Sequence, residues 1–286
     1  MTEEIRLAII GGSGLYSMEG LQDVQQKVVK TPFGEPSSPV MLGTLDGHRV
    51  AFLARHGLGH TLTPSEVNYR ANIYALKSLG ARFVLSVSAC GSLREDFEPG
   101  HIVVPDQLFD HTHLRARSFF GEGLVAHVGV ADPFCTPFGQ QIFAAAEAAG
   151  ATAHLGGGFI TIEGPRFSTR VESNTYRSWG LDIIGMTASP EAFLAREAEL
   201  HYGVMAHITD YDVWHEEPVS VEMVVRTLNE NTVHAQGAIR HLVSHLEPEK
   251  SCDCQHALAN ALMTAKGKVP GTTRRKLGLL VDKYLD

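Results

Sequence analysis

Cysteine is scarce in this chain, which holds only Cys90, Cys135, Cys252 and Cys254 among its 286 residues. So few cysteines exclude a disulfide scaffold for a protein of this length, and we expect reduced thiols. Cys252 and Cys254, followed by His256, have a spacing that would suit a metal ion. Because no second pair of ligands stands beside them in the sequence, we predict no metal site.

Long apolar runs and dense basic runs are also absent. No stretch approaches the roughly 20 apolar residues of a membrane span, and the apolar run near the acidic N-terminus is too short for the core of a signal peptide. The 24 basic residues stand against 32 acidic ones, for a net charge of -8, and they form no cluster that would bind nucleic acid. We therefore expect a cytoplasmic protein that binds neither membranes nor nucleic acids.

Glycine is plentiful, and three glycines interrupted by Ser13 follow the strand-like run at 7–10. Such a loop opens the backbone to an anion. The dinucleotide fingerprint would need glycine where the chain has Ser17, and no Gly-Lys-Ser/Thr sequence closes a phosphate loop of the Walker type. The loop alone is compatible with a free phosphate or with a tight turn that binds nothing.

Strand-like and helical segments alternate along the chain, and 44% hydrophobic residues suffice for a substantial core. Strands are predicted at 7–10, 39–45, 49–54, 83–88, 101–104, 159–162, 182–186 and 204–208. Helices are predicted from Thr63 to Gly80 and at 136–150, 168–179, 189–202 and 219–245, with two short pieces separated by Pro270. This order indicates an α/β fold with a mixed central sheet flanked by helices.

A polar break at 247–250 divides the predicted organisation. We expect one domain over residues 1–246 and a helical extension over 247–286 that packs on or near it. No internal repeat, low-complexity segment or long linker argues for a further division.

Several predicted strands end in polar or small residues, where α/β sheets bind their ligands. Arg55 and His56 could clamp an anion or form a surface turn. The small residues at 86–92 could offer backbone amides or pack against a helix. Phe167 could stack on a planar ligand. Asp210 and Asp212 could converge across a turn, or cap a loop.

An ordered set of eight motifs closely resembles the trimeric purine nucleoside phosphorylase family, on its branch that acts on 5′-methylthioadenosine. The motifs are Gly-Gly-Ser-Gly-Leu (11–15), Thr-Pro-Phe-Gly (31–34), Ala-Arg-His-Gly (54–57), Pro-Ser-x-Val-Asn-Tyr-Arg-Ala-Asn (64–72), Ala-Cys-Gly-Ser-Leu-Arg-Glu (89–95), Glu-Gly-Pro-Arg-Phe-Ser (163–168), Met-Thr-x-x-Pro-Glu (186–191) and Thr-Asp-Tyr-Asp-x-Trp (209–214). The resemblance covers about residues 5 to 245 and fades over the last 40.

The resemblance implies a homotrimer, with two paired trimers as an open alternative, and a site that needs no cofactor. Inorganic phosphate is the co-substrate, held by Ser13, Arg55, His56, Ser88, Ala89 and Thr187. Relatives often have threonine at positions 13 and 88, and serine keeps the hydroxyl. Met186 would contact the ribose, and the 5′ group would meet His60, His127 from across a subunit boundary, Val221 and Val224.

The base end of the implied site favours adenine. Relatives specific for 6-oxopurines carry glutamate and asparagine where this chain has Ser168 and Asp210. A carboxyl group at Asp210, supported by Asp212, can donate to N7 and accept from an exocyclic amine. Phe167 and the valines near the sugar favour a methylthio group over a hydroxyl, although apolar pockets discriminate by only about 1–3 kcal/mol per group.

The implied reaction is the phosphorolysis of 5′-methylthioadenosine to adenine and 5-methylthioribose 1-phosphate, a pentosyl transfer of purine and methionine salvage. Asp210 is the expected general acid. Three alternatives stay open on the sequence: a phosphorylase for methylthioinosine or 6-oxopurine nucleosides, an NAD-dependent oxidoreductase that uses the glycine loop, and a nucleoside-binding module without catalysis.

Overall fold

The computed structural model describes residues 4–12, 15, 18–215, 220–248 and 252–285, with only the backbone described at 228–230. Ser13, a predicted phosphate ligand, lies outside the described residues. Within them, no helix is both long and apolar enough to cross a membrane.

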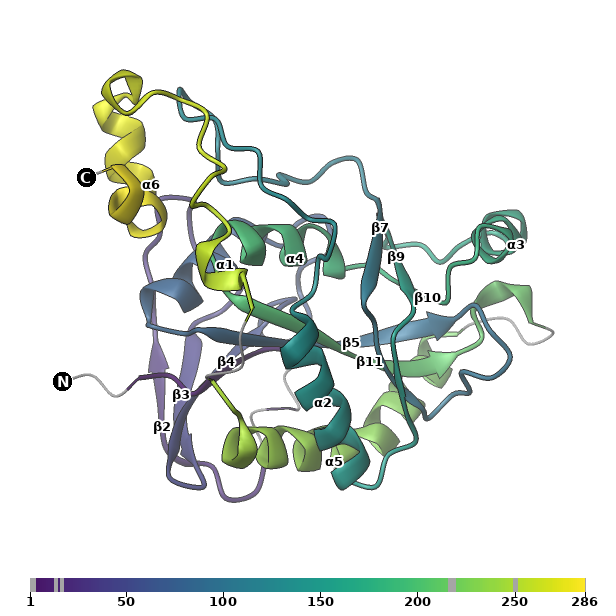
Figure 1. The fold of residues 1–286 in the computed structure, drawn as a ribbon. Coiled ribbons are helices and arrows are strands. Elements are labelled where there is room, and N and C mark those ends of the chain that lie inside the picture. The colour runs from purple at the N-terminus through teal and green to yellow at the C-terminus, as the bar shows by residue number, and fades with distance from the viewer. Residues whose placement is uncertain (1–3, 13–14, 16–17, 216–219, 249–251, 286) are drawn as a thin grey trace.

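One mixed sheet of eleven strands organises the molecule (Figure 1). The order along its main path is β2-β3-β4-β1-β5-β10-β9-β7, with β11, β6 and β8 branching from β5. The strands are β1 Leu7–Gly11, β2 Gln22–Lys27, β3 Val40–Leu45, β4 His48–Ala54, β5 Phe83–Ser92, β6 Ile102–Val104, β7 Gln107–His111, β8 Ala153–Leu155, β9 Gly158–Ile162, β10 Ile183–Gly185 and β11 His201–Asp210. β5 is the hub, since it runs parallel to β1 and β11 and antiparallel to β10.

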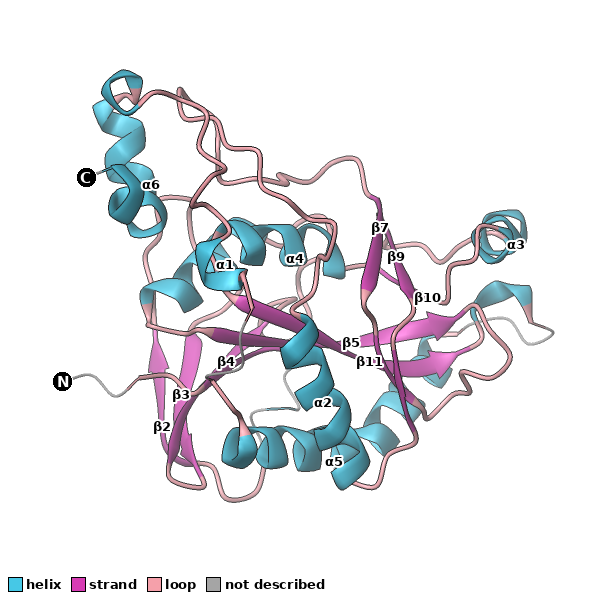
Figure 2. Ribbon diagram, viewed as in Figure 1, coloured by secondary structure: helices cyan, strands magenta, loops and turns pink. Residues whose placement is uncertain are grey.

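Helices cover both faces of the sheet (Figure 2). They are α1 Tyr69–Ser78, α2 Thr136–Ala148, α3 Arg170–Ser178, α4 Ala188–Glu197, α5 Val221–His245 and α6 Gly271–Leu285. Helices α2 and α5 pack against each other and β11 in one apolar cluster, while α1 and α4 pack together in another on the opposite side. The α/β fold class expected from the sequence is confirmed, because buried strands such as β1 and β11 need apolar cover on both faces.

Three strands were not predicted from the sequence. All six residues of β2 are exposed, and five of them are Gln, Asp or Lys. The strands β7 and β8 are short and half-buried, and each contains polar residues. None has the apolar run or the alternation by which a strand is detected, and pairing with a neighbouring strand forms each of them.

The predicted helix start, with Thr63 as the N-cap, is wrong, since α1 begins five residues later, at Tyr69. Asn68 is the N-cap and accepts from the Ala71 N–H, whereas Thr63 and Glu66 close an isolated turn through their own hydrogen bonds. The Ser65 hydroxyl bonds to Glu163, a tertiary contact that holds this turn outside the helix.

Other boundaries also differ from the prediction. Helix α4 ends at Glu197, and β11 already begins at His201, where the helix was expected to continue to residue 202. Helix α3 starts at Arg170, with Thr169 rather than Ser168 as the N-cap of its capping box. In the C-terminal tail, the part before Pro270 forms only two three-residue 3-10 turns, while the part after it is the 15-residue helix α6. Because Thr169 is the N-cap of α3, the Ser168 hydroxyl has no capping role.

Candidate active site

A cavity of about 510 Å³ lies at the carboxyl ends of the parallel strands β1, β4, β5 and β11. Loops after β9 and β10, together with one face of α5, complete its wall. Parallel strands end at the same edge of a sheet, so residues far apart in the sequence meet there. This cavity therefore joins seven of the eight motif regions or their immediate neighbours.

Most of the predicted site residues line this cavity. They are Arg55, His56, His60, Ser88, Ala89, Phe167, Ser168, Met186, Thr187, Asp210, Asp212 and Val224. Val221 does not line it and is 68% exposed at the start of α5. His127 is exposed on a loop whose backbone pairs with Ala261, away from the cavity of its own chain. Whether His127 meets the cavity of another subunit stays a prediction.

Arg55 is held more tightly than the sequence suggests. Its Nε and Nη2 form a bidentate ion pair with Glu191 of α4, at 3.0 and 3.1 Å, and both side chains are almost fully buried. Nη1 donates to Val87 O, and Nη2 also bonds to Ser86 Oγ at 2.7 Å. The Tyr202 hydroxyl donates to the same carboxylate at 2.8 Å. Arg55 is thus a fixed positive charge in the cavity wall rather than a free clamp.

The other predicted anion ligands surround this charge. Ser88 Oγ lies 3.5 Å from Ser86 Oγ, which connects it to Arg55. Thr187 occupies the N-cap position of α4, yet its hydroxyl makes no capping bond, so it can turn to a ligand at the positive end of the helix. These groups form a cluster of donors suited to an anion.

The histidine beside Arg55 is neutral near pH 7. Burial, followed by the charge of Arg55, lowers the pKa of His56 to about 4. Its Nδ1 lies 2.9 Å from Leu62 O and must donate to that carbonyl, which leaves Nε2 with a lone pair. His56 can therefore accept a hydrogen bond from a protonated phosphate through Nε2.

The two carboxyl groups predicted to converge do so at the end of β11. Asp210 Oδ1 accepts from the Asp212 N–H at 2.8 Å, and Oδ2 accepts from Thr209 Oγ1 at 2.7 Å. These two bonds lower the pKa of Asp210, but burial has the larger effect and raises it. Burial, with the charge of Asp210 added, raises the pKa of Asp212 to about 6. The pair can therefore hold a proton close to neutral pH.

The position of this pair depends on a glycine of β5. A Cβ added to Gly91 would lie 2.9 Å from Asp210 Oδ1 and 3.3 Å from Asp212 Cβ. Only glycine leaves space for both side chains beside the strand. The sequence offered Gly91 as part of a motif but gave no sign of this contact.

Several buried polar atoms of the cavity have no hydrogen-bond partner among the described residues. They are Ser168 Oγ, Asp212 Oδ2 and both ring nitrogens of His207. Buried polar groups are nearly always paired in native proteins, so unpaired groups facing a cavity indicate a polar ligand or water. Burial, followed by the charge of His234, lowers the pKa of His207 to about 4, and the ring is neutral.

Arg115 was missed by the sequence analysis although it supports two walls of the site. It is buried and donates to Met186 O at 2.6 Å, Ser189 O at 2.7 Å and Glu163 O at 2.7 Å. These bonds connect the loop after β9 to the loop after β10. Arginine in an irregular loop carries no periodic signal, and the same holds for the pairing of Glu191 with Arg55.

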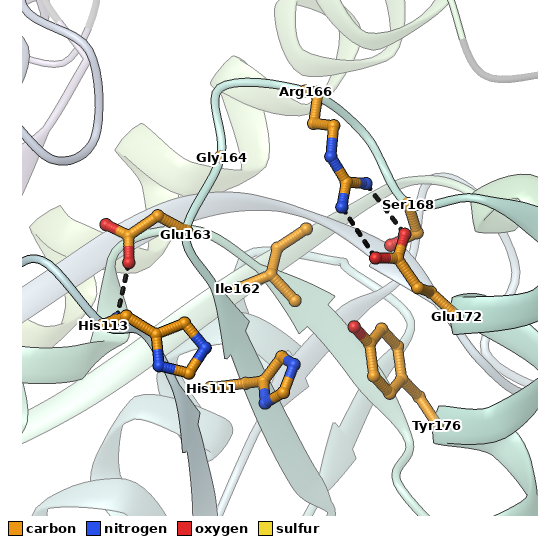
Figure 3. A pocket seen from close by; sticks show the side chains of 9 residues that line it. All are labelled: His111, His113, Ile162, Glu163, Gly164, Arg166, Ser168, Glu172 and Tyr176. Atoms are coloured by element: carbon orange, nitrogen blue, oxygen red, sulfur yellow. Dashed lines mark hydrogen bonds and ion pairs between the residues drawn. The ribbon is translucent and has the colours of Figure 1, made fainter.

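A smaller pocket of about 260 Å³ adjoins the cavity and shares Ile162 and Ser168 with it (Figure 3). At its rim, Arg166 and Glu172 form an ion pair, with contacts of 2.7 and 2.8 Å. On the other side, Glu163 accepts from the backbone N–H of His113. Glu163 and Glu172 of this pocket are each ion-paired with an arginine, whereas in the larger cavity Asp212 Oδ2 has no partner among the described residues.

The family profile described as "Phosphorylase superfamily" matches residues 6–244 of the chain. S-methyl-5'-thioadenosine phosphorylase from Geobacter sulfurreducens is 53% identical over 98% of this chain and 99% of its own length. The protein of that name from Koribacter versatilis is 51% identical, over 98% and 97% of the two chains.

Solved structures agree with these sequence matches. A methylthioadenosine phosphorylase from an Antarctic soil metagenomic library superposes with a TM-score of 0.94 and 45% identity, covering 98% of this chain and 99% of that one. The methylthioadenosine phosphorylase of Schistosoma mansoni in complex with adenine gives 0.84 and 38%, over 90% and 96%.

Proposed function

The chain belongs to the phosphorylase superfamily, and from that premise we propose that it catalyses the attack of inorganic phosphate on 5′-methylthioadenosine. The products are adenine and 5-methylthioribose 1-phosphate, so the enzyme is a pentosyltransferase. A single observation carries the proposal: one cavity contains both a buried carboxyl pair with raised pKa values and a separate cluster of anion-binding donors.

Two charges must be stabilised when the bond between sugar and base breaks. Positive charge develops on the ribose and negative charge on the purine, as in glycoside hydrolysis. A phosphate bound under the anomeric carbon serves as nucleophile and as counter-charge to the ribose. A proton delivered to N7 lets adenine leave as a neutral molecule.

We assign the proton to the carboxyl pair. Asp210 is the general acid, and Asp212 shares its proton and accepts from the exocyclic amine of adenine through Oδ2, which has no partner among the described residues. When Asp210 is protonated, it can donate to Thr209 Oγ1, whose own hydrogen then turns to Cys90 O at 3.3 Å. The network therefore accommodates both protonation states without leaving a donor unpaired.

We assign phosphate to the donor cluster. Ser88, the Ala89 backbone and Thr187 supply direct hydrogen bonds, and His56 accepts one from a protonated phosphate through Nε2. Arg55 contributes its charge, which the buried partner Glu191 orients. We also assign Ser13 to phosphate, because the family resemblance implies it.

The remaining groups of the cavity are assigned to the sugar and its 5′ substituent. Met186, whose Sδ would lie 2.6 Å from a Cβ added at Gly164, is assigned to the ribose. Val224 and His60 surround the 5′ group, and Phe167 closes over the nucleoside. We further propose a homotrimer in the cytoplasm, in which His127 completes the 5′ pocket of a neighbouring subunit.

Phosphate-dependent release of adenine by the purified protein tests the proposal. We expect turnover of 5′-methylthioadenosine only with phosphate present, and a higher kcat/KM than for methylthioinosine. Adenine release at the same rate without phosphate would make the protein a hydrolase. Preference for the 6-oxo substrate would overturn the assignment of Asp210, and ligand binding without turnover would leave only a nucleoside-binding module.

A further inference from the structure

Four side chains with metal-binding atoms lie together at the amino end of β11. Cys135 is the N-cap of α2, His201 is the first residue of β11, and Cys252 and Cys254 follow α5. Their ligand atoms all lie within 4.8 Å of one another. At about 3.3 Å per residue, the length of β11 separates this cluster from Asp210 by about 30 Å. It is thus independent of the cavity, which none of the four residues lines.

The spacing of the ligand atoms matches a tetrahedral metal site. Cys135 Sγ and Cys252 Sγ are 3.7 Å apart, and His201 Nδ1 lies 3.5 Å from the first and 3.2 Å from the second. Zinc bonds of about 2.3 Å to sulfur and 2.0 Å to nitrogen give tetrahedral edges of about 3.8 and 3.5 Å. A disulfide would need sulfurs about 2.05 Å apart. The three observed distances agree with these edges to within about 0.3 Å, and Cys254 Sγ lies within 4.8 Å of each of the other ligand atoms.

The contacts of His201 on its other side favour the tautomer that a metal requires. The Gln255 amide is satisfied only when its oxygen faces donors of Arg82 and His201, and His201 Nε2 then donates to Gln255 Oε1 at 2.9 Å. With the hydrogen on Nε2, the lone pair is on Nδ1 and points at the sulfurs. Metal-bound histidines characteristically donate their other N–H to an oxygen in this way.

Charge and burial also agree with a bound ion. Cys135, His201 and Cys254 are each at most 4% exposed, and Arg196 Nη1 lies 3.3 Å from Cys254 Sγ. Three thiols that bind a divalent ion release three protons, and the resulting centre carries one negative charge. Arg196 can balance that charge, as a buried ion requires.

We propose that Cys135, His201, Cys252 and Cys254 form a structural zinc site. Three thiolates and one imidazole are a donor set that zinc prefers, and four protein ligands leave no open position for chemistry. The second ligand pair that the sequence did not place beside Cys252 and Cys254 is supplied by the fold. His256, which the sequence singled out, is not in the cluster.

The site would anchor the C-terminal tail to the core. Residues 252–285 also contact the core through buried apolar side chains, among them Leu258, Leu277 and Val281. Polar contacts add to these, such as Lys283 Nζ to Glu199 Oε2 at 2.6 Å and Tyr284 OH to Glu199 Oε1 at 2.5 Å. Figure 1 shows α6 at the edge of the molecule, beyond the helices that cover the sheet. A metal that joins the start of the tail to α2 and β11 restrains the segment leading to it.

Metal analysis of the tag-free protein, purified without chelator, tests the site. We expect one zinc per chain in the wild type, loss of zinc in Cys254→Ser and His201→Gln, and retention in Cys90→Ser, which removes the one cysteine outside the cluster. Removal of zinc from the wild type should lower its Tm. Protein isolated with four free thiols and no zinc, with iron instead, or with a disulfide among the three cluster cysteines would overturn the proposal.

Cobalt provides a second measurement if the cluster variants fail to fold. Co²⁺ added to reduced, metal-free wild type should give the visible absorption of a tetrahedral ion and a thiolate charge-transfer band. The same spectrum is expected from Cys90→Ser. Spectra of octahedral cobalt, without thiolate bands, would exclude the site.

Discussion

Replacing Asp210 by asparagine should remove the proton for the departing base while preserving the surrounding hydrogen bonds. In the wild type, Asp210 accepts from the Asp212 N–H at 2.8 Å and contacts Thr209 Oγ1 at 2.7 Å. An asparagine oxygen keeps the first bond, and its NH₂ can donate to Thr209, whose hydrogen then turns to Cys90 O. We therefore expect the variant to fold normally and to lose chemistry.

The size of the loss follows from the role of the proton. General acid catalysis contributes about 10²–10⁴-fold, or about 3–5 kcal/mol of the barrier. Because burial raises the pKa of both carboxyl groups, the wild type keeps this acid near neutral pH, and asparagine cannot replace it. We expect kcat for 5′-methylthioadenosine to fall by about a hundredfold or more, with a relaxed preference for adenine over hypoxanthine.

The pH profile distinguishes loss of the acid from a mere change of shape. With saturating phosphate, wild-type kcat should fall as pH rises above the raised pKa values of the pair, about 6 for Asp212, because the proton is then lost. The variant should lack this decline. Adenine release is measured by chromatography, urea unfolding checks the fold, and Asp212→Asn is the matched variant. An unchanged rate and profile in Asp210→Asn would show that the proton comes from elsewhere.

Three further perturbations test the site and its support. Gly91→Ala places a Cβ 2.9 Å from the acid carboxylate, so kcat should fall while the protein stays folded. Arg55→Ala leaves the buried Glu191 charge unpaired, and we expect a loss of about 3–5 kcal/mol in unfolding free energy together with a higher KM for phosphate. Burial raises the pKa of Glu197 to about 7 in the folded protein. Its contribution to the free energy of unfolding is therefore complete below about pH 4.5 and is lost as the pH rises to about 7. Glu197→Gln should flatten this decline.

Each of these has a control and a contrary result. Gly129→Ala adds a methyl group with no atom within 4 Å, and an equal loss of kcat in both glycine variants would refute the steric argument. Arg55→Met combined with Glu191→Leu should recover part of the lost stability, and an untouched KM for phosphate in Arg55→Ala would remove Arg55 from the site. For Glu197, urea unfolding measures the free energy of unfolding of the wild type and of Glu197→Gln, below about pH 4.5 and above about pH 7. The same dependence on pH in both proteins would contradict the assigned titration.

Much of the fold could be read from local patterns. Apolar runs revealed β1, β4 and β9 to within a residue or two, and helix caps with proline and glycine marked α2. The start of α1 was misplaced because Thr63 and Glu66 make helix-start hydrogen bonds that no helix follows. These bonds would be the same at the start of a helix, and the contacts that accompany the isolated turn, between Ser65 and Glu163, are made with a distant part of the chain.

The predicted site residues came mainly from the ordered motifs, and the structure brings most of them to one cavity. What the sequence did not reveal are the partners that set their chemistry. Glu191 fixes the guanidinium of Arg55, Gly91 makes space for Asp210, and Arg115 joins two loops of the wall. The residues that these contacts join are 48 to 136 positions apart in the sequence, and no local pattern reports them.

The sequence by itself determined the fold class, the strand ends that carry the chemistry and the choice of aspartate over asparagine at position 210, because these depend on local periodicity and on residue type. Only the tertiary structure decided the protonation of Asp212 and His56 and the meeting of Cys135 with His201 and Cys254. Those properties arise from burial and from distances across the sheet. Both are set when strands far apart in the chain become neighbours.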